Sequence, residues 1–194
     1  MVFNKGAEFI PVEKKEGPNI IPKIIHQVWV GGPMPYAKRY FLEKTKKMYP
    51  DYEFMVYGEE NVTRERFPLH YDIIMNLLNY QKNRKPAFGK LATVTDLIRH
   101  EALYRMGGFW RDSGTNPFKP VYNSFLKYDF VVGAERTLRH RWNQGMCFFA
   151  NAPGNENIYR VVSLRNVNRV RFYEKDALVT TGPINFRLVL DGDE

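Results

Sequence analysis

Short apolar runs along the chain alternate with longer stretches in which apolar residues recur every three or four positions. Residues 23–30 (KIIHQVWV) are mostly β-branched or aromatic and stop at Gly31-Gly32-Pro33, which is typical of a buried strand that ends in a turn. Similar patterns predict further strands at 53–58, 109–111, 127–135 and 145–153.

The stretches between these strands favour helices. Residues 36–49 predict a basic amphipathic helix, and the strongest pattern lies within 85–108, where Leu91, Val94, Ile98 and Ala102 share helical spacing and Gly107 follows as a stop. Weaker patterns predict short helices around 61–66, 70–80 and 155–168, and a turn leading into a helix within 180–190.

Strands that alternate with helices predict an α/β domain with a mixed, mostly parallel sheet flanked by helices. Residues 1–19 are polar and without a steady period, so we expect a flexible arm ahead of a single domain at 20–194. Ligands bind such sheets beyond the carboxyl ends of the strands. Because turns follow three predicted strands at 31–33, 58–61 and 112–117, we expect residues 26–29 and Asp112 to face one cleft.

The formal net charge of +8 favours phosphate-bearing partners but does not choose among nucleotides, nucleic acids and anionic membranes. The chain has no signal-peptide pattern and no run of about 18 apolar residues, so we expect a soluble cytoplasmic protein without a transmembrane segment, in a bacterium or a virus-infected host cell. Cys147 is the single cysteine, which excludes a disulfide within the chain and a cysteine metal cluster.

Two features carry candidate chemistry. Asp96 and Arg99 are three residues apart on the predicted helix, which fits either an exposed ion pair or a pair that binds ribose hydroxyls and a diphosphate. Asp112 follows a strand and precedes a turn, which fits either a turn-initiating aspartate or an oxygen ligand for Mn²⁺ or Mg²⁺ on a diphosphate.

Four segments in order, IPKIIHQVWVGG, YPDYEFMVYGEEN, TDLIRHEALYRMGGFWRDSGTNPFKP and TTGP, resemble glycosyltransferase family 32 over roughly residues 20–190. The resemblance implies a single GT-A-type nucleotide-sugar-binding domain, a UDP- or GDP-sugar donor, a divalent metal, and retention of configuration at the anomeric carbon. The donor-binding residues that it implies are His26, Gln27, Val28, Trp29, Asp96, Arg99, Trp110 and Asp112, with Asp112 also binding the metal.

The sequence departs from that family at its Asp-x-Asp motif. Gly114 stands where the second aspartate belongs, and losing that carboxylate weakens a Mn²⁺ or Mg²⁺ site. Ser113, Thr115 or Asn116 would substitute only in part, and Asp191, Asp193 or Glu194 would have to reach back from the end of the chain.

The sequence therefore predicts a glycosyltransferase that moves a hexose to a glycan or protein hydroxyl, with Glu135, Asn143 and Gln144 as candidate sugar-face catalytic residues. One alternative keeps the fold as a catalytically impaired nucleotide-sugar-binding protein. A second alternative, a basic nucleic-acid-binding module, has only the charge and the Arg-rich stretch 136–171 in its favour, so no nucleic-acid partner is expected.

Overall fold

The computed structural model describes residues 17–82, 88–135 and 143–163. Its described strands form one sheet in the order β2-β1-β3-β5-β4. β1 pairs in parallel with both β2 and β3, whereas β5 is antiparallel to β3 and β4. The strands are β1 (Ile24–Val28), β2 (Glu53–Tyr57), β3 (Gly108–Arg111), β4 (Phe130–Glu135) and β5 (Asn143–Asn151).

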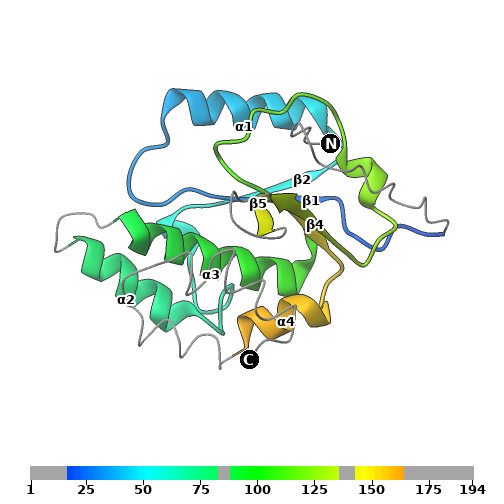
Figure 1. Cartoon of the computed structure of the whole chain (residues 1–194). Helices are drawn as coiled ribbons and strands as arrows, with labels where there is room; N and C mark the ends of the chain where they lie inside the picture. Colours follow the sequence, from blue (N-terminus) through cyan, green and yellow to red (C-terminus); the bar gives the residue numbers. More distant parts are fainter. Residues whose placement is uncertain (1–16, 83–87, 136–142, 164–194) are drawn as a thin grey trace.

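Helices lie on both faces of this sheet (Figure 1). α1 covers one face, and α2, α3 and α4 lie along the other. The predicted α/β class with a mixed sheet is therefore confirmed. The helices are α1 (Tyr36–Met48), α2 (Tyr71–Lys82), α3 (Phe88–Met106) and α4 (Glu156–Val162), with 3₁₀ turns η1 (Glu59–Asn61) and η2 (Tyr122–Phe125).

Each face of the sheet has its own core. Below the sheet, Val28, Ile98 and Trp110 belong to the buried cluster that joins α2, α3 and α4 to the strands. Above it, Tyr122 of η2 stacks on Tyr49 and on Phe109, with ring centroids 4.6 and 4.8 Å apart. Many of the aromatic residues in the described chain thus fill a core.

α3 ends as its sequence predicts. Gly107 adopts φ +65° and its N–H donates to the Leu103 carbonyl at 2.9 Å, which closes the last turn. The chain then reverses into β3. α3 therefore runs antiparallel to β1 and β3, and its amino-terminal half lies at the carboxyl edge of those strands.

Most predicted elements are present, with shifted ends. The helix predicted around 61–66 is wrong, because η1 is one 3₁₀ turn and residues 64–66 form a turn. The 3₁₀ turn ends at Val62, whose backbone is extended with φ −81° and ψ 97°. Of the helix predicted at 155–168, the structure describes α4, and residues 164–168 lie outside the described ranges. The 1–19 arm up to residue 16, and the segment 180–190, lie outside the described residues.

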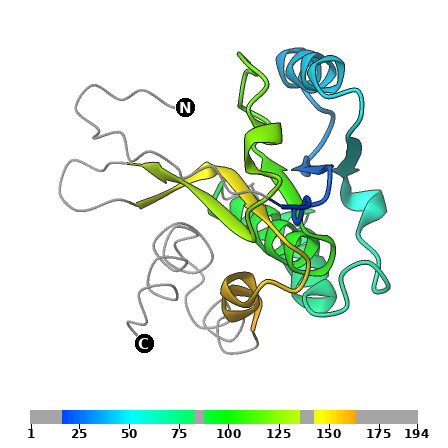
Figure 2. The ribbon, with the colours of Figure 1, turned by 90° about the vertical axis from the view of Figure 1, so that its right-hand side faces the viewer.

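The β4–β5 hairpin continues beyond the rest of the sheet, away from the body of the fold (Figure 2). Its ladder changes register between Val132 and Gly133, a bulge that bends the pair.

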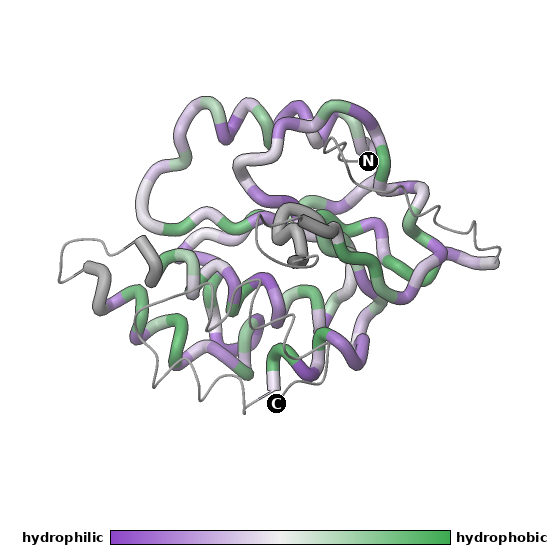
Figure 3. Tube along the Cα trace, viewed as in Figure 1, coloured by the Kyte–Doolittle hydropathy of each residue, from purple (hydrophilic) through white to green (hydrophobic). Residues whose placement is uncertain are grey.

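Hydrophilic and hydrophobic residues alternate along α1, the helix that covers one face of the sheet (Figure 3). No helix in the described segments is long and apolar enough to cross a bilayer.

Candidate functional site

The carboxyl ends of β1, β2 and β3 meet at one edge of the sheet. His26 is level with Met55 in β2 and with Trp110 in β3, so the three strands end within one or two residues of the same line. The turns predicted at 31–33, 58–61 and 112–117 therefore do share an edge. Trp29 directly follows β1 and Asp112 directly follows β3, and adjacent strands lie about 4.8 Å apart.

The loop after β1 is held in one conformation by its own contacts. The half-buried Trp29 donates its indole N–H to the Gly32 carbonyl at 2.8 Å. The N–H of Gly31 points to Glu59 Oε1 at 3.3 Å. Gly31 has φ +91°, and a Cβ there would approach Leu91 of α3 to 2.8 Å. This glycine lets the loop pack on the first half of α3.

The loop after β3 is fixed by a buried arginine. Asp112 is exposed and opens a turn in which the Thr115 N–H donates to the Asp112 carbonyl at 2.9 Å. Arg111 is 1% exposed and donates to Gln27 Oε1 of β1 and, at 2.7 Å, to the Thr115 carbonyl. Burial lowers the pKa of Arg111 below its ordinary value, but guanidinium groups stay charged in proteins. One buried cation thus joins β1, β3 and the turn that carries Asp112.

Asp96 and Arg99 form the predicted ion pair, and it is buried rather than exposed. The Arg99 guanidinium lies 5.1 Å from the centre of the Trp110 ring and 5.5 Å from that of Phe149. The pair therefore packs on the face of the sheet below β3 and β5. Asp96 precedes Arg99 by about 4.5 Å along the helix axis, toward the carboxyl edge, and keeps 8% of its surface exposed.

His26 and Val28 lie in the interior that supports the site. His26 is 0% exposed, its Nε2–H donates to the Gly107 carbonyl at 2.8 Å, and its Nδ1 accepts from the Tyr57 hydroxyl at 2.9 Å. Burial lowers the pKa of His26 to about 4 although the Gly107 hydrogen bond opposes that shift. Both ring nitrogens are thus engaged within the protein. Trp110, 1% exposed and in contact with the Arg99 guanidinium, is likewise part of the supporting core.

The candidate sugar-face residues lie on the hairpin. Glu135 is opposite Asn143 and Ala134 is opposite Gln144, at the outer end of the β4–β5 ladder. Because Val132 is level with Trp110 through Phe149, Glu135 lies only two positions, roughly 7 Å, past the end of β3 along the strand direction. The structure thus places Glu135, Asn143 and Gln144 on an arm beyond the strand ends.

The described residues do not fit a resident divalent cation at the Asp112 turn. No group of three or more His, Cys, Asp or Glu side chains suited to a metal occurs in the segments that the structure describes. A Cβ at Gly114 would lie 3.1 Å from the ammonium nitrogen of Lys38, so a positive charge stands where the second carboxylate of the motif would begin. Asp191, Asp193 and Glu194 lie outside the described residues.

Comparisons with known proteins agree with this architecture. A profile of the family described as capsular polysaccharide synthesis protein matches residues 3–177. This chain belongs to that family. A search of curated protein sequences returned no match.

Two solved structures of glycosyltransferases resemble the capsular polysaccharide synthesis chain. The PaToxG glycosyltransferase superposes with a TM-score of 0.64 and 19% identity, covering 91% of this chain and 71% of that one. The UDP-bound glycosyltransferase domain of the YGT toxin gives a TM-score of 0.48 at 11% identity, covering 91% of this chain and 68% of that one. The likeness to PaToxG shows the fold, and fold and family together support a glycosyltransferase. The membership of glycosyltransferase family 32 stays a prediction.

Two residues of the site escaped the sequence analysis. Arg111 stands within a strand whose four residues are all buried, and a charge in such a run signals an internal partner. Lys38 lies in a basic helix with many exposed charges, so nothing in the sequence distinguished it. Only its place beside Gly114 singles it out.

Proposed function

We propose that this chain transfers a hexose from a UDP- or GDP-sugar to a hydroxyl of a growing glycan or a protein, with retention at the anomeric carbon. The observation that carries the proposal is the shared strand edge: Trp29 and Asp112 follow adjacent parallel strands that end almost level. An indole and a carboxylate at that spacing suit the base and the ribose of one nucleotide. The capsular polysaccharide synthesis family supports sugar transfer as the reaction class.

Each residue of the edge has a part in this mechanism. The Trp29 indole stacks on the base, and its hydrogen bond to Gly32 holds the ring in place. The exposed Asp112 carboxylate accepts hydrogen bonds from the ribose hydroxyls, on a turn that Arg111 keeps in position. Asp96, held by Arg99 with part of its surface open, accepts a hydroxyl of the donor sugar.

The chemical step needs no strong base from the protein. The bond between the anomeric carbon and the diphosphate oxygen breaks, and the acceptor oxygen forms its bond on the same face of the sugar. The acceptor's proton passes to the departing diphosphate. The protein contributes by positioning the reactants and stabilising the leaving charge. Since the described residues do not fit a divalent cation, no step of this mechanism passes through one.

Titration calorimetry with UDP, GDP and their 2′-deoxy analogues tests the assignment. We expect Asp112→Asn to weaken binding of the preferred ribonucleotide about tenfold or more, because a charge-assisted hydrogen bond is lost. The same variant should leave binding of the deoxy analogue nearly unchanged if the carboxylate contacts the 2′ hydroxyl. Equal affinity of wild type and variant for every nucleotide would refute the role of Asp112.

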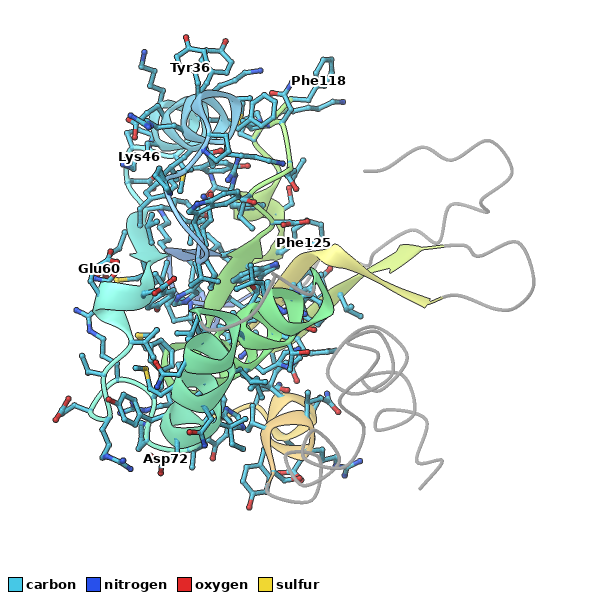
Figure 4. The ribbon with its side chains drawn as sticks, turned by 90° about the vertical axis from the view of Figure 1, so that its left-hand side faces the viewer. Tyr36, Lys46, Glu60, Asp72, Phe118 and Phe125 are labelled. Carbon is cyan, nitrogen blue, oxygen red and sulfur yellow. The ribbon has the colours of Figure 1, made fainter. Side chains whose placement is uncertain are left out.

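Asp72→Asn is the matched control. Asp72 is an exposed aspartate of α2 that pairs with Arg64, and it lies at the end of the molecule opposite Tyr36 and Phe118 (Figure 4). This substitution removes the same charge and should leave nucleotide affinity within about twofold.

The main alternative is a nucleotide-sugar-binding protein of this fold without turnover, and Gly114 is the residue in its favour. Mass spectrometry of reactions with a panel of UDP- and GDP-sugars and short glycan acceptors separates the two. Tight binding with neither transfer nor donor hydrolysis would favour the alternative.

A further inference from the structure

The turn after β3 is the one place in the described chain where a lysine ammonium lies beside an open glycine at the strand edge. Lys38 Nζ is 3.1 Å from the point where a Cβ on Gly114 would stand. Gly114 does not adopt a positive φ, so its backbone does not require glycine. The absent side chain instead leaves room for the ammonium group.

A second lysine of the same helix contacts the same loop. Lys44 donates to Asn116 Oδ1 at 3.0 Å, two residues beyond Gly114. α1 therefore presents two cations along the 112–117 turn, and its first turn carries no acidic side chain. Lys38 forms no ion pair with any residue that the structure describes. Its charge is available to a ligand at this edge.

We propose that Lys38 binds the diphosphate of the donor directly and supplies the positive charge that a divalent cation would otherwise provide. This inference rests on the proposed function. Lys38 is held on a helix above the turn, while Asp112 lies on the turn itself and Arg111 fixes that turn from below through the Thr115 carbonyl. A phosphate group between Asp112 and α1 would meet an ammonium donor where the second acidic residue is missing.

The charge balance of the reaction agrees with this role. When the sugar leaves, negative charge grows on the terminal phosphate. An ammonium at hydrogen-bond distance therefore stabilises the transition state more than it stabilises the bound substrate. A metal bound at the same point would be repelled by Lys38, and the described residues offer it no group of three or more acidic, histidine or cysteine ligands. Binding should therefore be insensitive to Mg²⁺, Mn²⁺ and chelator.

The test measures the affinity of inorganic pyrophosphate and of UDP and GDP by calorimetry, with Mn²⁺ and with EDTA. We expect pyrophosphate and the preferred nucleotide to bind equally in both conditions. Lys38→Met should weaken both ligands about tenfold or more, because it keeps the side chain's length and removes its charge. Lys46→Met is the matched control, since Lys46 is on the same helix but pairs with Glu43. It should change either affinity less than about twofold.

A second substitution tests the geometry. Gly114→Asp places a carboxylate against the Lys38 ammonium. In EDTA it should therefore weaken the binding of pyrophosphate as much as Lys38→Met does. The double variant Lys38→Met/Gly114→Asp should bind either ligand better with Mn²⁺ than with EDTA. Thermal unfolding of each variant shows whether it is folded.

The outcomes separate this inference from the proposed function. Unchanged pyrophosphate affinity in folded Lys38→Met overturns the role of Lys38. A loss of pyrophosphate binding by the wild type on adding EDTA overturns it as well. Either result leaves the assignment of nucleotide binding in place. Pyrophosphate binding that depends on Lys38, without any binding of UDP or GDP, supports the anion site and overturns the donor assignment. Failure of the wild type to bind any of these ligands overturns both.

Discussion

Protonation of His26 should make the fold acid-sensitive, and the size of the effect follows from its burial. His26 has a pKa of about 4 in the folded protein, against 6.5 for an exposed histidine. A folded-state pKa below the unfolded one means that the unfolded chain takes up the proton first as pH falls. The stabilisation is therefore fully present above pH 6.5 and is lost between 6.5 and 4.

The magnitude is the pKa difference multiplied by 1.36 kcal/mol per unit, which gives about 3 kcal/mol over the whole range. At pH 5 about 2 kcal/mol of it is lost, a large share of the stability of an ordinary domain. His26→Gln keeps an amide donor for Gly107 and an acceptor for Tyr57 but cannot titrate in this range.

Urea unfolding at pH 5.0 and 7.5 measures the effect. The wild type should lose about 2 kcal/mol more than His26→Gln between the two conditions. Burial also lowers the pKa of His100 below its ordinary value, but that histidine is present in both proteins and cancels in the difference. Equal losses in the two proteins would refute the reasoning, whatever the stability of the variant at neutral pH.

Three further substitutions, two of them with a matched control, have expected outcomes measurable by the same unfolding assay. Gly107→Ala should lower the free energy of unfolding by roughly 2–4 kcal/mol, because φ is +65° and the new Cβ would lie 2.7 Å from the backbone at the end of β5. Gly154→Ala is the control: φ is +68° but the space around it is open, so it should cost only about 1 kcal/mol. Equal costs would contradict the crowding argument. Glu101→Ala should cost about 2–4 kcal/mol, since its buried carboxylate accepts the backbone N–H groups of residues 69 and 70, while Asp72→Ala, in an exposed pair, should stay within about 1 kcal/mol. Arg111→Lys should lose about 1–3 kcal/mol because one amine cannot reach both acceptors as a guanidinium does; an unchanged midpoint would show that the fork is not needed.

The elements with strong local patterns were predictable from the sequence. The helix around Leu91 and Ala102 was marked by apolar spacing and ended by Gly107, and both signals act within a few residues. The helix predicted around 61–66 is absent because the backbone is already extended at Val62, and Pro68 disfavours a helical conformation at Phe67.

The site was predictable only as an edge. The strand ends at Trp29 and Asp112 followed from the rule that parallel strands present their carboxyl ends together. The partner of Arg111, Gln27, is 84 residues away in the chain, so no local pattern could reveal it. The same holds for Lys38 and Gly114, whose proximity depends on how α1 lies over the turn.

The order of the strands also decides when β3 gains its second neighbour during synthesis. β3 lies between β1 and β5, so a nascent chain that has emerged only as far as residue 142 leaves one side of β3 without a partner. An unpaired strand flank is a template for pairing with other chains. Translation arrest or premature termination before β5 should therefore yield products that aggregate rather than shorter folded ones, even though Trp29, Asp96 and Asp112 have all been made by then.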